Sequence, residues 1–167
     1  MHQIRAAGPS DFACLPAIED ASDTLLAAAL AGPDGGPVPS LPAVTGVPHS
    51  TASLCVLVAG NPPHAFARLE EVDGQVHLEQ LSVHPAHVRQ GLGRALVEAA
   101  LGWARERGYG RMTLSTYRDV PFNAPFYARC GFVPLAEPGP ELAALRRHEQ
   151  GIGLDLLGPR ICMAKEL

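Results

Sequence analysis

Two glycines at alternate positions stand between a predicted strand and a predicted helix. They lie in the segment Arg89-Gln90-Gly91-Leu92-Gly93-Arg94, a few residues after the apolar strand expected at 75–83. Glycine has no Cβ atom, so main-chain N–H groups of such a loop turn into one concavity, where the positive end of the helix dipole adds its field. The pattern predicts a site for a phosphorylated ligand.

Two common nucleotide loops do not match this segment. A Walker-type loop needs a Gly-Lys pair followed by Ser or Thr, and neither residue is present here. The dinucleotide fingerprint needs a third glycine where Leu96 stands, and an acid at the end of the next strand, which residues 111–116 lack. A different class of phosphate loop is indicated.

The segment resembles motif A of the GNAT superfamily, the acyl-CoA-dependent N-acetyltransferases. Gly91 and Gly93 occupy its two glycine places, and Val88 stands where the family writes Gln or Arg. The resemblance implies that this loop binds the coenzyme A pyrophosphate, mainly through main-chain amides. Arg94 could add a charged contact or pair with Glu98 one turn later. The expected cofactor-binding residues of the loop are Arg89, Gln90, Gly91, Leu92, Gly93 and Arg94.

A second segment, 123–132, resembles a later motif of the same family, in which a helix carries a tyrosine and closes with Gly-Phe. Tyr127 matches the tyrosine that the family uses as general acid toward the leaving thiolate, since a phenol of pKa ~10 keeps its proton at neutral pH. A core tyrosine with a bonded hydroxyl is the alternative interpretation. Phe126 and Asn123 are expected to contact the cofactor, although Asn123 lies only one turn before Tyr127 and helix capping is its more favoured role.

The resemblance implies an α/β (α+β) chain with the GNAT fold, as a single domain over residues 1–167. Its sheet would be mixed and mostly antiparallel, with about six to seven strands, one parallel splayed pair and about four flanking helices. The pantetheine arm would enter between the splayed strands and bond to the free edge of one of them. By position, this edge is formed by Leu81, Ser82 and Val83.

Acetyl transfer to an alkylamine of pKa ~10.4 is helped by a base that removes the ammonium proton. Glu79 is the first candidate, because strand alternation places it on the same face as His77, Leu81 and Val83. An exposed strand carboxylate is the alternative. His77 is the second candidate for the base and His84 the third.

Periodicity and turn residues predict the elements that position these groups. Strand 111–116 should run parallel to strand 75–83, because a helix of suitable length joins them. Asp73-Gly74 indicates a hairpin turn. The Pro/Gly-rich segment at about 31–49 is expected to be a loop, either one wall of the acceptor site or an insertion without function. The expected strands are 3–6, 54–59, 66–72, 75–83, 111–116, 132–135 and 160–165, and the expected helices are 12–20, 91–107, 124–130 and 141–150.

Composition narrows the class of protein further. The chain has 167 residues, 47% of them hydrophobic, with a formal net charge of −4 and no Lys/Arg-rich run, which gives little support to nucleic-acid binding. The apolar run 25–30 is too short to cross a bilayer, so we expect no membrane partner and a cytoplasmic location. Four scattered cysteines and seven scattered histidines lack metal-ligand spacing, so no metal is expected.

The resulting hypothesis is an acetyl-CoA-dependent N-acetyltransferase that acetylates a primary amine of a small molecule or peptide by direct attack in a ternary complex. Glu19, Asp20 and Asp23 could attract a cationic amine or form a solvated helix end. Alternatives are a catalytically weak acyl-CoA-binding sensor or interaction module, and an acyltransferase that uses another acyl donor or a hydroxyl acceptor. The sequence leaves open whether the protein is a monomer or a homodimer.

Overall fold

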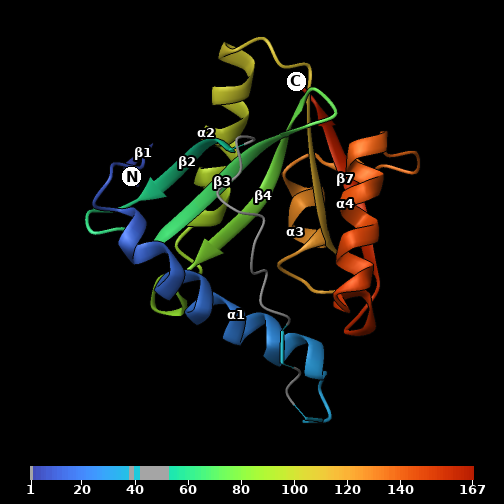
Figure 1. The fold of residues 1–167 in the computed structure, drawn as a ribbon. Coiled ribbons are helices and arrows are strands. Elements are labelled where there is room, and N and C mark those ends of the chain that lie inside the picture. The colour runs from blue at the N-terminus through green and yellow to red at the C-terminus, as the bar shows by residue number, and fades with distance from the viewer. Residues whose placement is uncertain (1, 38–39, 42–52) are drawn as a thin grey trace.

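The computed structural model describes residues 2–37, 40–41 and 53–167, which form a seven-stranded sheet with helices on both faces (Figure 1). The strand order is β1-β2-β3-β4-β5-β7-β6, and every neighbouring pair is antiparallel except β4–β5, which is parallel. The mixed sheet with one parallel pair is confirmed. The strands are β1 (Ile4–Ala6), β2 (Ser53–Ala59), β3 (Ala65–Val72), β4 (Gln75–Val83), β5 (Arg111–Tyr117), β6 (Val133–Pro134) and β7 (Arg160–Glu166).

Four α-helices cover the two faces of the sheet (Figure 1). Helices α2 and α3 pack on one face in the main hydrophobic cluster, while α1 and α4 pack on the other in two smaller clusters. Among the helices of the described residues, none is long and apolar enough to span a bilayer. The helices are α1 (Leu15–Ala31), α2 (Leu92–Glu106), α3 (Ala124–Arg129) and α4 (Pro140–Gly151), and the short 3-10 helices are η1 (Phe12–Cys14), η2 (Pro85–His87) and η3 (Leu154–Leu156).

Strand β3 shows how side-chain alternation builds the two layers. Ala65, Ala67 and Leu69 face α2 in the main cluster, whereas Phe66 between them packs with Ile18 of α1. The sheet is therefore apolar on both faces, as an internal layer must be.

Helix α1 is longer than predicted. The expected helix at 12–20 is replaced by Leu15–Ala31, because the Ala- and Leu-rich run that follows has high helix propensity and continues the helix to Gly32, at φ +78°. Asp11 gives no side-chain cap, since its carboxylate accepts hydrogen bonds from Arg5 at 2.6 and 2.9 Å instead. Of the predicted loop at 31–49, Ala31 belongs to α1, 32–35 form turns, and 42–49 lie outside the described residues.

The predicted Asp73-Gly74 turn joins β3 to β4, and both residues adopt positive φ angles of 54° and 69°. Asp73 has a second role, because its carboxylate accepts the N–H groups of Glu141 at 2.8 Å and Leu142 at 3.0 Å. Glu141 accepts the Asp73 N–H in return. A hairpin turn thus caps the start of α4, 68 positions further along the chain.

Candidate active site

The parallel strands β4 and β5 separate soon after they begin. Only two residue pairs join them, Val76 with Met112 and His77 with Thr113, whereas β3 pairs with β4 along its length. Beyond His77 no further β4–β5 pair forms within the described chain, so the edge of β4 that faces β5 is open there. The predicted residues Leu81, Ser82 and Val83 lie on this open stretch.

The glycine loop lies at the far end of β4, where α2 begins. Arg89 and Gly91 have left-handed φ angles of 61° and 78°, and Gly91 supplies no side-chain cap to the helix. The N–H groups of the first turn have no acceptor inside the helix, so they are available to an anion. Arg94 forms the expected ion pair with Glu98 one turn later, since Arg94 Nε lies 3.0 Å from Glu98 Oε1.

Gly93 links the loop to the open strand edge. A Cβ atom built on it would contact Phe126 Cζ at 3.6 Å, and Leu81 Cδ2 and Val83 Cγ2 at 4.0 Å each. The start of α2, the edge of β4 and helix α3 therefore meet at Gly93. Their meeting point combines main-chain donors at the helix start with apolar side chains.

Tyr127 lies on α3, on the same face of the sheet. It is 8% exposed, with its ring edge-on to Phe126 and Phe132 at centroid distances of 5.1 and 5.9 Å. Its hydroxyl makes no hydrogen bond to any residue that the structure describes. Burial raises the pKa of Tyr127 well above its ordinary value, so the phenol keeps its proton.

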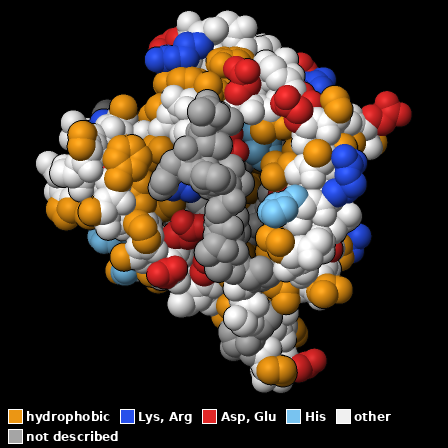
Figure 2. All heavy atoms as spheres, in the orientation of Figure 1, with side chains coloured by type: hydrophobic (Ala, Val, Ile, Leu, Met, Phe, Trp, Pro, Cys, Tyr) orange, Lys and Arg blue, Asp and Glu red, His pale blue; other side chains and the backbone are white. Residues whose placement is uncertain are grey.

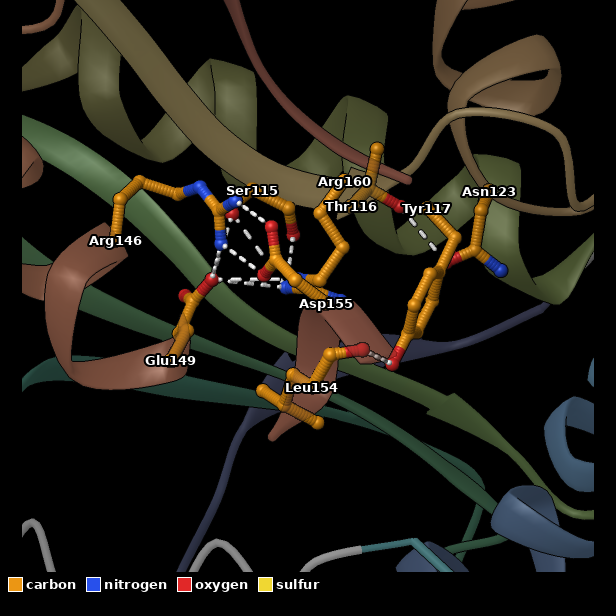
Figure 3. A network of polar contacts seen from close by, with 9 residues as sticks. All are labelled: Ser115, Thr116, Tyr117, Asn123, Arg146, Glu149, Leu154, Asp155 and Arg160. Carbon is orange, nitrogen blue, oxygen red and sulfur yellow. Dashed lines mark hydrogen bonds and ion pairs between the residues drawn. The ribbon is translucent and has the colours of Figure 1, made fainter. Parts of the chain in front are cut away.

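Asn123 is the N-cap residue of α3, but its side chain caps nothing, contrary to the favoured prediction. Its Oδ1 instead accepts a hydrogen bond of 2.7 Å from the buried Thr116 hydroxyl of β5. Figure 3 shows the Asn123 nitrogen pointing away from Thr116. The Asn123 side-chain nitrogen can therefore donate a hydrogen bond in another direction.

Glu79 lies on the opposite face of the sheet from Leu81 and Val83, so that part of the alternation argument was wrong. The β3–β4 register pairs Leu69 with Leu78 but Arg68 with Gln80, which leaves Glu79 as the extra residue of a β-bulge. The bulge shifts the alternation by one position. Glu79 thus turns toward α1, on the same face as His77.

On that face Glu79 meets several charges. Its Oε2 lies 3.5 Å from Arg68 Nη1, and its side chain is 19% exposed. Burial raises the pKa of Glu79 to about 7, and while Arg68 opposes this, Glu70 and Glu19 add to it. A carboxyl group with this pKa changes protonation near neutral pH, as a general base should.

Acidic residues of α1 extend this charged region. Burial raises the pKa of Glu19, and it raises that of Asp23 to about 6, with Glu19 and Asp20 adding to the Asp23 shift. Figure 2 shows acidic side chains gathered on this face of the molecule. Glu19 therefore lies near Glu79, and Asp20 and Asp23 lie near Glu19. Together these carboxylates form a region suited to a cationic group.

The other two candidates for the base have structural partners. His77 is 2% exposed, its Nδ1 lies 2.9 Å from Thr113 Oγ1, and burial lowers its pKa to about 4. It joins β4 to β5 at their last paired residues. His84 accepts the Ala86 N–H through Nδ1 at 3.1 Å and caps η2.

A network of ion pairs holds α4 and η3 against β5 and β7 on the α1 side of the sheet (Figure 3). Arg146 binds Glu149 at 2.6 Å and Asp155 at 2.7 Å, and Arg160 lies 3.3 Å from Glu149. Ser115 of β5 donates to Glu149 at 3.0 Å. Sequence reasoning missed this network. The i,i+3 spacing of Arg146 and Glu149 on one helix could have indicated that pair, whereas the contacts of Glu149 with Ser115 and Arg160 join separate elements.

The Acetyltransferase (GNAT) family model matches residues 37–132, more than half of the chain. The chain belongs to this family. The matched residues end at Phe132. They include the glycine loop, Glu79 and Tyr127, but neither α4 nor β7.

Solved structures of GNAT proteins share the whole fold. The PaiA N-acetyltransferase of Thermoplasma acidophilum, in complex with coenzyme A, has a TM-score of 0.68 at 14% identity, covering 100% of this chain and 99% of that one. The ribosomal-protein-S18-alanine N-acetyltransferase of Escherichia coli has a TM-score of 0.61 at 20% identity, covering 99% and 94%. A GNAT acetyltransferase of Brucella melitensis, in complex with acetyl-CoA, has a TM-score of 0.58 at 20% identity, covering 80% and 83%.

Proposed function

We propose that this GNAT domain is an acetyl-CoA-dependent N-acetyltransferase that acetylates a primary amine of a small molecule or peptide. The observation that carries this proposal is the early end of the β4–β5 ladder, beside the glycine-flanked start of α2. The gap has a buried tyrosine on one face of the sheet and a carboxylate of raised pKa on the other. Two substrates can thus approach one point from opposite sides.

The residues around the gap fit the cosubstrate. Acetyl-CoA would supply an acetyl group activated as a thioester. The first N–H groups of α2 and the Arg89 side chain suit the pyrophosphate, and the open edge at Leu81–Val83 suits the amide groups of an extended arm. Asn123 offers a donor beside that arm. The coenzyme A complex of the Thermoplasma protein and the acetyl-CoA complex of the Brucella protein support this assignment.

Proton transfers are divided between the two faces. Glu79 accepts a proton from the incoming ammonium group, directly or through water, because a carboxyl of pKa about 7 is substantially ionised at neutral pH. Tyr127 retains a proton that it can donate to the departing thiolate. Direct attack requires both substrates to be bound at once, which the two-sided arrangement favours.

The acceptor is proposed to be a cationic amine. Glu19 and Asp23 of α1 and Glu70 of β3 lie around the route to Glu79 and would attract an ammonium group. Such attraction raises the local concentration of the amine without selecting one compound.

The test has a binding arm and a turnover arm. Calorimetry with coenzyme A measures cosubstrate binding, and thiol release from acetyl-CoA with a panel of amines measures turnover, with mass spectrometry of the products. We expect saturable binding and release of thiol in step with an N-acetylated product. Absence of coenzyme A binding by folded protein would contradict the proposal, and binding without turnover for any amine would favour an acyl-CoA sensor.

A further inference from the structure

Among the described residues, Arg68 is the cation that lies with the carboxylates around Glu79. Arg68 of β3 is half-buried, its Nη1 lies 3.5 Å from Glu79 Oε2, and its guanidinium carbon lies 5.6 Å from the centre of the Phe66 ring. The β-bulge causes this meeting, because Arg68 pairs with Gln80 across the strands and the extra residue turns to the same side. Phe66 in turn is fully buried against α1, so the guanidinium rests on a fixed surface.

We propose that Arg68 is a positioning residue for catalysis, which holds Glu79 through Oε2 and leaves Oε1 directed to the amine. This inference rests on the proposed function, in which Glu79 is the base. Within the described residues, Oε1 makes no hydrogen bond, so it remains available to accept a proton. A carboxylate held through one oxygen loses less orientational freedom in the reaction than a free one.

The charges that face Glu79 come from two elements. Strand β3 contributes Arg68 and Glu70, and α1 contributes Glu19, with Asp20 and Asp23 next to it. The carboxylates favour a protonated Glu79, and Arg68 is the cation that opposes them. The positive charge of Arg68 would also disfavour the ammonium form of an amine bound beside Glu79. Both effects promote the reactive pair, an ionised base and a neutral amine.

The experiment compares pH profiles of kcat/KM for an amine that the wild-type protein acetylates. The wild type should lose activity as the pH falls through about 7, where Glu79 gains its proton. In Arg68→Met the same loss should occur about one pH unit higher, because an opposite charge nearby lowers a carboxyl pKa by one unit or more. Near pH 6 the variant should lose about tenfold through this shift, in addition to a smaller, pH-independent loss because Glu79 is no longer held. Near pH 9 only the smaller loss should remain.

Three further variants separate this role from a structural one. Arg68→Lys keeps the charge and should restore most of the wild-type profile. Arg111→Met breaks an exposed ion pair at the start of β5, with Glu166 at 2.6 Å, and should leave the profile unmoved. If Arg68→Met does not fold, Arg68→Gln replaces it, and the same upward shift is required.

Several outcomes would overturn the inference. An unmoved profile in folded Arg68→Met or Arg68→Gln contradicts it, and so does an equal loss of activity at every pH. Glu79→Gln tests the underlying assignment separately, since it should abolish the acid limb. If the limb survives in Glu79→Gln, the base assignment fails and this inference with it. If wild-type protein acetylates no amine, the proposed function fails as a whole.

Discussion

The two faces of the sheet at the β4–β5 gap differ in the way they are built. On the α2 and α3 face, Tyr127 lies among aromatic rings, and the groups proposed to bind phosphate are main-chain amides at Gly91 and Gly93. On the α1 and α4 face, Glu79 lies among charged side chains. Main-chain groups can bind a common cosubstrate whatever the neighbouring side chains are, whereas charged side chains select an acceptor.

The faces also differ in how far apart their parts lie in the chain. The proposed cosubstrate face is made from three compact segments, 81–83, 89–94 and 123–132. The acceptor face is joined by distant contacts, such as Arg68 with Glu79 across a bulge and Asp73 with Glu141 across 68 positions. Local patterns therefore describe the first face much better than the second.

The largest expected effect is that of Tyr127→Phe. Removing the phenol proton should lower kcat for thiol release by about a hundredfold or more, because general acid catalysis contributes factors of this size. The KM for acetyl-CoA should change little, since the ring remains. Steady-state assays check both values. Tyr109→Phe is the control, as it removes an exposed hydroxyl that bonds Glu71 at 2.9 Å. A kcat within about twofold of wild type in Tyr127→Phe would assign the acid elsewhere.

The local structure of the proposed cosubstrate face was predicted well for a physical reason. Positive φ at Gly91, the unpaired amides at the start of α2 and the turn at Gly131 depend on nearby residues, so they leave local signatures. The strands were predicted for the same reason, since alternation follows from burial of their faces. The parallel pairing of β4 and β5 followed from the helix between them.

A substitution at Gly93 should weaken the binding of coenzyme A without lowering the stability of the fold. Gly93→Ala would place a methyl group at ordinary contact distance from Phe126, Leu81 and Val83, inside the space assigned to the cosubstrate. We expect the Kd for coenzyme A to rise about tenfold by calorimetry, with unchanged thermal stability. Gly102→Ala, on an open position of the same helix, is the matched control and should bind as wild type. Equal affinities in the two variants would place coenzyme A elsewhere.

The acceptor face was predicted poorly, and Glu79 shows why. Strict alternation placed Glu79 on the same face as Leu81 and Val83, because a bulge cannot be inferred from one strand alone. Asn123 presents the same limit. Its sequence context favoured a local helix cap, but its side chain instead accepts a hydrogen bond from Thr116 on β5.

A change at Asp73 should affect stability and spare the cosubstrate. Asp73→Ala removes the acceptor for two N–H groups at the start of α4, which should lower the free energy of unfolding by about 1 kcal/mol and the melting temperature by about 3 °C. Asp73→Asn keeps a residue suited to the positive φ and one acceptor oxygen, so it should lose less. Thermal melts measure the loss of stability in each of the two variants. A raised Kd for coenzyme A in Asp73→Ala would contradict the separation of the two faces.

The smallest expected effect tests a contact within the cosubstrate face. Thr116→Val keeps the shape of a buried side chain but removes the hydroxyl that holds Asn123 Oδ1 at 2.7 Å. The Asn123 carboxamide would then turn freely, and its donor would no longer be fixed toward the cosubstrate. We expect the Kd for coenzyme A to rise about threefold, since one hydrogen bond contributes only about 1 kcal/mol net.

Thr116→Ser is the matched control for that change, because it retains the hydroxyl and removes only a methyl group. It should keep wild-type affinity while losing some stability through the small cavity left behind. If both variants bind coenzyme A equally well, Thr116 acts only in packing and Asn123 needs no orientation. If only Thr116→Val is weakened, Asn123 donates to the cosubstrate, and β5 contributes to the cosubstrate face through a side chain that never touches the ligand.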